Sequence, residues 1–214
     1  MTSSSAQAAT LVDDFSTNQS AVLPFVQTSV GVVSTSSPLV GGTDLVGANR
    51  FVALNAQSLD LPGVDSVGVD VLEANGLFDY QSTAGANGKA SLVYVDFDPI
   101  DASNLQIEID FEAYDQAGGQ EISIFAGFYV GNMPIFATTV MTSGAGAQTV
   151  VAIPTSAGFD DALITQITDI TVEFDAPKAA DFRVSAVRLA VIPEPASLGL
   201  LAVGGTLLAG RRRS

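Results

Sequence analysis

Apolar and polar residues alternate with a period of two along much of the chain. In residues 105–113, five apolar side chains alternate with Gln106, Glu108, Asp110 and Glu112. A helix would spread these carboxylates around its circumference, whereas a strand places them all on one face. The pattern therefore predicts a strand with one face in the core and the other in water, and it favours a solvated strand face over a site for the three carboxylates.

Other segments repeat this period or form short apolar runs. Alternation recurs in residues 67–71 and 170–175. Apolar runs predict more strands at residues 50–55, 91–97, 121–130, 135–142 and 148–153, separated by turns rich in Gly, Asn, Asp and Pro. Residues 159–166 have a local helical pattern, and residues 28–43 fit an irregular strand pair or a loop. Many short strands at such spacing predict an all-β fold, an antiparallel sandwich or barrel.

The two ends of this region both have β character, in residues 11–16 and 181–189. With the strand count and the acidic-Phe-Ser sequence at 14–16, they resemble the opening and closing strands of jelly-roll carbohydrate-binding domains. The resemblance implies that residues 11–191 form one jelly-roll β-sandwich domain. It also implies that the first and last strands lie together.

The end of the chain has a different pattern, in which a proline-flanked acid, an apolar run and a basic cluster follow one another. These parts are Pro193, Glu194 and Pro195, the uncharged residues 196–210, and Arg211, Arg212 and Arg213. The run predicts a single transmembrane helix with the arginines at its cytoplasmic end. Its length of roughly 22 Å is below the ~30 Å hydrocarbon core, which favours a temporary anchor. The alternative is a core helix whose basic end suits the helix dipole.

This order of parts resembles the sorting tail of PEP-CTERM proteins, and we take residues 192–214 as that tail. The resemblance implies that an exosortase-type membrane protease recognises Pro193, Glu194 and Pro195 and cuts near them. It further implies an exported protein that is briefly anchored in the inner membrane. The protein would then reach the cell surface or an extracellular polysaccharide matrix.

Residues 1–10 lack the basic and apolar regions of a secretory signal peptide but contain the A-x-A pattern Ala6-Gln7-Ala8. We interpret them as the remnant of a signal peptide whose beginning lies upstream. The alternative is a disordered Ser/Ala terminus. An in-frame basic and apolar stretch upstream of Met1 distinguishes the two interpretations.

Composition excludes several functions. Residues 1–191 contain 5 Lys or Arg and 22 Asp or Glu, a net charge of about −17, which excludes nucleic acid as a partner. The chain has no Cys and no His, so disulfides, thiolate chemistry, His-dependent triads and the usual zinc sites are absent. We therefore predict a protein that is not an enzyme.

Two groups of acids are candidates for calcium, a cation that prefers oxygen ligands. By the jelly-roll resemblance, pairing of the first and last strands would bring together Asp13, Asp14, Asp175 and Asp181 as possible calcium ligands. The alternative is that charges on these strands block further strand pairing. For Asp96, Asp98 and Asp101, an Asp-rich turn is favoured over a metal site.

Aromatic residues bear on sugar binding, which commonly uses exposed rings. The chain has no Trp and four Tyr. Tyr80 and Tyr114 lie near turn signals and are predicted to be exposed, whereas Tyr94 and Tyr129 lie in apolar runs and are predicted to be core. The leading hypothesis is a non-catalytic surface or matrix protein. The alternatives are a carbohydrate-binding module, with or without calcium, and a hydrolase that uses two carboxylates across a cleft.

Overall fold

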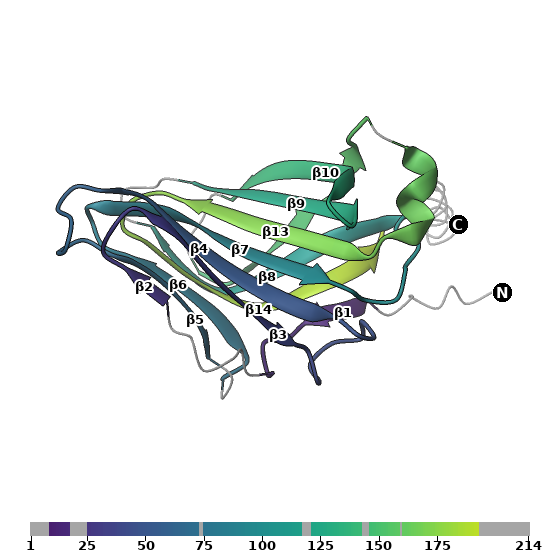
Figure 1. Ribbon diagram of the computed structural model, residues 1–214, viewed down its shortest axis with the longest axis horizontal. Coiled ribbons are helices and arrows are strands. Elements are labelled where there is room, and N and C mark those ends of the chain that lie inside the picture. Colours follow the sequence, from purple (N-terminus) through teal and green to yellow (C-terminus); the bar gives the residue numbers. More distant parts are fainter. Residues whose placement is uncertain are drawn as a thin grey trace, which may run out of the picture.

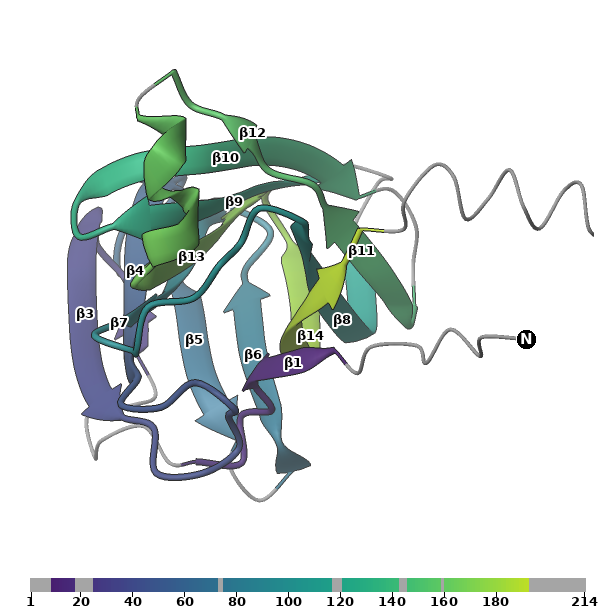
Figure 2. The same ribbon diagram turned by 90° about the vertical axis from the view of Figure 1, so that its right-hand side faces the viewer.

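The computed structural model describes residues 9–17, 25–72, 75–116, 121–142, 146–158 and 160–192. These residues form two antiparallel β-sheets packed face to face, which confirms the predicted β-sandwich (Figures 1 and 2). Within the described ranges no helix is long and apolar enough to cross a membrane. The predicted sorting tail, from Pro193 onward, and residues 1–8 lie outside these ranges.

Sheet A has the order β11-β8-β14-β6-β5-β2, and β1 also pairs with β14. Its strands are β1 (Thr10–Asp13), β2 (Phe25–Gln27), β5 (Val67–Leu72), β6 (Leu77–Ser82), β8 (Leu105–Gln116), β11 (Gln148–Ala152) and β14 (Ala180–Val191).

Sheet B has the order β12-β10-β9-β13-β7-β4-β3. Its strands are β3 (Gly31–Pro38), β4 (Asn49–Leu59), β7 (Ala86–Val95), β9 (Ile122–Val130), β10 (Met133–Thr142), β12 (Thr155–Ser156) and β13 (Asp169–Ala176). The helical pattern near residue 160 corresponds to the 3-10 helix η2 (Asp161–Gln166), which begins where the Asp160 side chain accepts a hydrogen bond from the Ala162 N–H.

The first and last strands of the sandwich pair with each other, as the sequence predicted. Thr10 lies opposite Leu189 and Asp13 opposite Val187 in an antiparallel register with one irregularity. Figure 2 shows β1 beside β14. Strand β14 pairs with β1 near its C-terminal end and with β6 near its N-terminal end, both along one edge. Its other edge pairs with β8 along the whole strand. Strand β14 therefore lies in the interior of sheet A.

The core is rich in aromatic side chains from both sheets. Phe182 stacks on Tyr80 with ring centroids 4.8 Å apart, and it contacts Phe174 of sheet B at 5.0 Å. Phe78 and Phe111 extend this cluster. Aromatic pairs at these distances stabilise a core by more than their buried area alone, so a chain without disulfides can rest on packing.

One buried ion pair also joins the two sheets. Arg50 of β4 donates from Nη1 to Asp13 Oδ2 of β1 over 2.7 Å, and both side chains are fully buried. Arg50 Nη2 donates to the Thr17 carbonyl over 2.6 Å, and the guanidinium lies 5.6 Å from the centroid of the Phe15 ring. Burial, followed by the charge of Asp13, holds the pKa of Tyr94 well above its usual range. The pair fixes the N-terminal segment against sheet B.

Candidate binding site

The outer face of sheet B carries an open hollow built by strand register. Along β4, β7 and β13, the inward residues Val52, Leu92 and Val172 are fully buried, so their neighbours Phe51, Val93 and Thr171 point outward. Phe51 lies opposite Val93, and Val93 opposite Thr171. Thr171 in turn lies opposite Gly127 of β9. The register thus aligns these four small or apolar residues in one row across β4, β7, β13 and β9.

Gly127 keeps this row low at its β9 end. A Cβ atom added there would lie 3.0 Å from Cε2 of Tyr129 and 3.2 Å from the Phe136 carbonyl oxygen. Contacts that short are tighter than most real Cβ contacts, so the Tyr129 ring would have to shift by a few tenths of an ångström to accept a larger residue. The absent side chain lets the ring lie over the sheet beside the hollow.

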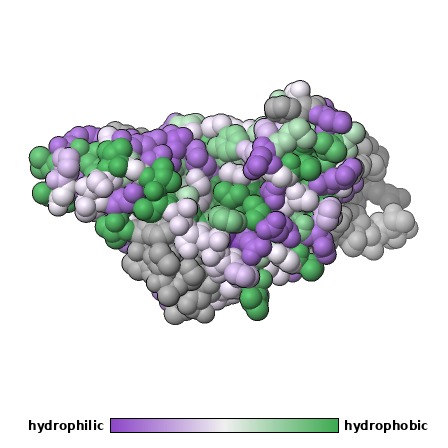
Figure 3. Space-filling model, in the orientation of Figure 1, coloured by the Kyte–Doolittle hydropathy of each residue, from purple (hydrophilic) through white to green (hydrophobic). Residues whose placement is uncertain are grey.

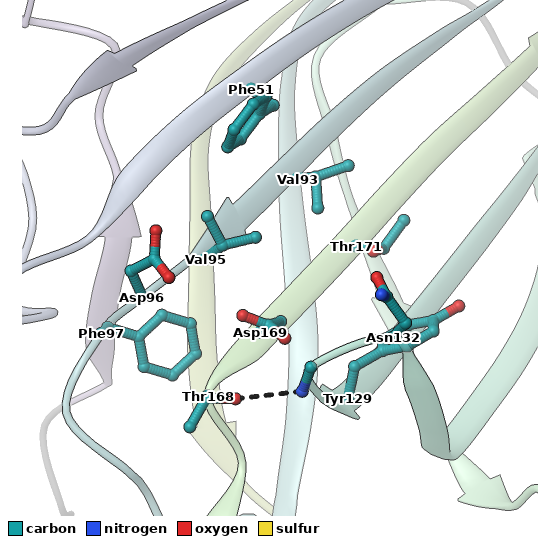
Figure 4. Close-up of a pocket in the computed structure, with 11 residues that line it drawn as sticks. Phe51, Val93, Val95, Asp96, Phe97, Tyr129, Asn132, Thr168, Asp169 and Thr171 are labelled. Carbon is teal, nitrogen blue, oxygen red and sulfur yellow. Dashed lines mark hydrogen bonds between the residues drawn. The ribbon is translucent and has the colours of Figure 1, made fainter.

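The hollow has a volume of about 660 Å³. Phe51 and Val93 line one part of it, and Tyr129 and Asn132 line another. In the close-up view Asp96 lies to one side, next to Val95 and Phe97, and Asp169 lies between Asp96 and Tyr129 (Figure 4). Figure 3 views the molecule from the side on which sheet B lies in front, and it shows apolar surface in the middle of this face next to hydrophilic residues. The lining therefore combines aromatic rings with hydrogen-bonding groups.

Asp96 enters the hollow from the turn after β7. Its backbone φ is +63°, a left-handed conformation that Asp tolerates better than most residues. The side chain is exposed, and Asp96 Oδ2 accepts a hydrogen bond from Asn49 Nδ2 over 3.2 Å. The turn is held by a hydrogen bond from the Asp98 N–H to the Val46 carbonyl over 3.0 Å. The carboxylate is thus positioned by the backbone.

Asp169, the first residue of β13, is the buried acid of the hollow, with 7% of its surface exposed. Burial raises the pKa of Asp169, and the charge of Asp96 raises it further. Hydrogen bonds from the backbone N–H groups of Asp96 and Gly131 and from Thr168 act in the opposite direction. Thr168 itself accepts a hydrogen bond from the Gly131 N–H over 3.3 Å, drawn in Figure 4. Two carboxyl groups therefore share one end of the hollow.

The structure does not bring the four predicted calcium ligands together. Asp13 forms an ion pair with Arg50, and the Asp14 side chain accepts a hydrogen bond from the Ser16 N–H over 2.9 Å. Asp175 lies in sheet B, 3.2 Å from Lys89, and Asp181 lies in sheet A, where it accepts from the Ser82 N–H over 3.1 Å. No group of three or more acids in the described ranges is placed to hold a metal ion. The predicted pairing of the first and last strands is confirmed, but the four acids contact different partners.

Other predicted acids fall in the expected surroundings. Glu108, Asp110 and Glu112 lie on the outer face of sheet A, where Asp110 pairs with Arg188. Asp98 and Asp101 are exposed in the turn after β7, and Asp101 accepts from the Ser103 N–H over 2.9 Å. Asp96, from the same Asp-rich turn, is the member that reaches the hollow.

Three of the four tyrosine predictions were wrong. Tyr80 is fully buried and Tyr114 is 3% exposed, although both were expected on the surface. Tyr129 was expected in the core but is half-buried and lines the hollow, whereas Tyr94 is buried as predicted. The alternation of side chains along a strand could have placed Tyr129 correctly. Phe128 points into the core, so its neighbour Tyr129 points to the opposite face.

No protein-family model matches the sequence, and no curated protein matches it. Solved structures with a similar fold include carbohydrate-binding modules. The family 11 module from Clostridium thermocellum, in complex with a β-1,3-1,4-mixed-linked tetrasaccharide, is 17% identical over 89% of this chain and 99% of that chain, with a TM-score of 0.41. TmCBM61, in complex with β-1,4-galactotriose, is 11% identical over 77% of this chain and 90% of that chain, with a TM-score of 0.32. Similarity this low transfers no ligand and no binding residue to this chain.

Proposed function

We propose that residues 11–191 form a non-catalytic, jelly-roll carbohydrate-binding module whose site is the hollow on sheet B. The observation that carries this proposal is the pairing of aromatic and polar groups in one open depression. Phe51 is 39% exposed, more than the other Phe side chains whose burial the structure describes, and Tyr129 lies across the hollow from it. Sugar rings offer apolar C–H faces to such rings and hydroxyl groups to the polar side chains between them.

The polar lining suits hydroxyl recognition. Asp96 and Asp169 accept hydrogen bonds, Thr171 both donates and accepts, and the Asn132 amide does the same. Carboxylate acceptors form the stronger, charge-assisted kind of hydrogen bond. The volume of about 660 Å³ falls within the usual range for small-ligand sites. An open depression of this kind fits a short stretch of a longer glycan chain.

The hydrolase alternative receives less support from the geometry. A glycosidase needs two carboxyl groups on either side of the scissile bond, separated by about 5–9.5 Å. Here the backbone N–H of Asp96 stabilises the Asp169 carboxylate directly, so both acids belong to one wall. Release of reducing ends from a bound glycan would support the hydrolase instead.

Binding is tested with a panel of soluble polysaccharides and a glycan array, followed by calorimetry on the best ligand. Phe51→Ala and Tyr129→Ala should each weaken binding about tenfold or more, the effect expected for an aromatic anchor. Met141→Ala is the matched control, because Met141 is 54% exposed in β10 of the same sheet and does not line the hollow. Absence of binding to every glycan, or equal affinities for all three variants, would contradict the proposal.

We also propose the export route that the tail sequence implies, with transient anchoring through residues 196–210 and processing by an exosortase-type protease. The support is the order of Pro193-Glu194-Pro195, apolar run and three arginines. Deletion of residues 192–214 should abolish surface retention and processing in the native host. A tail with alanine at positions 193–195 should keep the anchor but lose the cut. Unchanged processing of that variant would contradict recognition of the motif.

A further inference from the structure

The hollow contains acidic side chains and no basic side chain among its described lining residues. Of the eleven described residues that line the hollow, two are Asp and none is Lys or Arg. Lys89, on the same outer face, pairs with Glu173 over 2.9 Å and Asp175 over 3.2 Å. Arg50 is fully buried on the inner side, bound to Asp13. Neither cation lines the hollow.

We infer that the hollow selects glycans that carry protonated amino groups, such as β-linked glucosamine chains, over neutral and acidic glycans. This inference rests on the proposed carbohydrate-binding function and specifies its ligand class. It stands on the location of Asp169 between Asp96 and Tyr129, where a sugar ring placed on Tyr129 would bring its substituents toward the two carboxyl groups (Figure 4).

The burial of Asp169 makes this preference more than a surface effect. Asp169 is 7% exposed as a residue, so its carboxyl group is partly desolvated, and hydrogen-bond donors of the protein stabilise its charged form. The neighbouring Asp96 charge opposes ionisation of the same group. A ligand ammonium would offset both penalties at once, whereas a hydroxyl group would supply a hydrogen bond without a charge.

The same arrangement disfavours acidic glycans. A uronate or sulfate group placed beside two carboxylates meets like charge at short range, and no basic side chain among the described lining residues would offset it. The remaining field of the molecule has the same sign, since the whole chain has a net charge of −15. We therefore expect the affinity to be highest for amino glycans, lower for neutral glycans and lowest for acidic glycans.

The experiment compares β-1,4-linked oligomers of glucosamine, glucose and glucuronate of equal length by calorimetry at about pH 6, where an amine is protonated. We expect the glucosamine oligomer to bind at least about tenfold more tightly than the glucose oligomer. Asp96→Asn and Asp169→Asn should each reduce that ratio several-fold, because they lower the affinity for the glucosamine oligomer more than the affinity for the glucose oligomer. These changes keep the size of the side chain but replace one acceptor oxygen with an NH2 donor, and circular dichroism confirms folding.

Asp98→Asn is the matched control, because it removes one exposed carboxylate from the same turn without touching the lining. If Asp98→Asn lowers the ratio as much as Asp96→Asn does, the preference reflects overall charge and the inference is overturned. Equal binding of glucosamine and glucose oligomers would overturn the inference while the carbohydrate-binding function stands. Absence of binding by all three oligomers, together with a negative glycan panel, would overturn both.

Discussion

Two acids of sheet A and the two acids of the hollow on sheet B differ in their partners. On sheet A, Asp79 pairs with Arg183 over 2.9 Å and Asp110 pairs with Arg188. On sheet B, Asp96 and Asp169 meet at one end of the hollow, and no ion pair to either is present among the described residues. Acids with a cross-strand basic partner stabilise pairing, whereas acids held together without one weaken the fold. The two acids of the hollow therefore keep a negative charge that no described basic side chain pairs with.

A break in the buried ion pair between the two sheets should have the largest effect. Arg50→Met would leave Asp13 buried without its cation and reduce the free energy of unfolding by about 3–5 kcal/mol. The double variant Arg50→Met with Asp13→Leu should recover much of that loss, because no unpaired charge remains. Urea denaturation measures both. A single variant as stable as the parent would show that this pair does not join the sheets.

A bulky residue at Gly127, next to the lining residue Tyr129, should have the next largest effect. Gly127→Val would push against Tyr129 and the Phe136 carbonyl, destabilise the fold by about 1–3 kcal/mol and displace the ring from the hollow. Glycan affinity should fall more than tenfold in the fraction that remains folded. Ser123→Val is the control, as it lies on the same face of β9 outside the lining. If both variants bind alike, the row through Gly127 is not the binding surface.

Removing the buried acid of the hollow should stabilise the protein. A raised pKa means that the folded state binds the proton more tightly than the unfolded state, so stability is lost as the pH rises through the folded pKa of Asp169. Asp169→Asn removes that loss and should raise stability at about pH 7 by roughly 0.5–2 kcal/mol. Near the ordinary Asp pKa of 3.8 the gain over the parent should vanish.

Thermal unfolding at both pH values measures this effect. Asp79→Asn provides the comparison from sheet A, because its carboxylate is paired with Arg183 and its loss should not stabilise the protein. A lower melting temperature for Asp169→Asn at neutral pH would mean that the two faces do not differ as described.

The smallest effect should come from a basic partner on sheet A. Arg183 is about half exposed, so Arg183→Ala should cost at most about 1 kcal/mol. Glycan affinity should stay within twofold of the parent, because Arg183 lies on the other sheet from the hollow. A large change in affinity would place the binding site on sheet A, where Arg183 and Asp181 line a smaller hollow of about 270 Å³.

The sequence alone predicted the strands whose side chains alternate cleanly. Residues 105–113 and 170–175 fall within β8 and β13, and the two terminal segments pair as β1 and β14. Strand β6 was missed, since Leu77–Ser82 mixes polar and apolar residues without a regular period and still buries four of its six side chains. The weak stretch at 28–43 includes an edge strand, β3.

The site itself was out of reach of the sequence. Phe51 and Tyr129 are 78 positions apart, and they share a face only because β4, β7, β13 and β9 pair in one register. Asp96 was interpreted as one acid of a turn. Asp169 was not predicted as a site residue, because its contact with the backbone of Asp96 depends on how the turn after β7 folds. Local pattern specifies which side of a strand a residue faces, whereas pairing across the sheet decides its neighbours.

The interior position of β14 has a mechanical consequence. A pull on the residues that follow Val191 would act on a strand bonded to β8 along one edge and to β6 and β1 along the other. The hydrogen bonds on both edges of β14 would then resist its sliding at the same time. An edge strand has such bonds on one side only. If the hollow on sheet B holds a fixed polymer and the segment after Val191 is anchored, tension between the two would cross the aromatic core between the sheets. Shear resistance of β14 would then set how much drag the domain withstands before it unfolds.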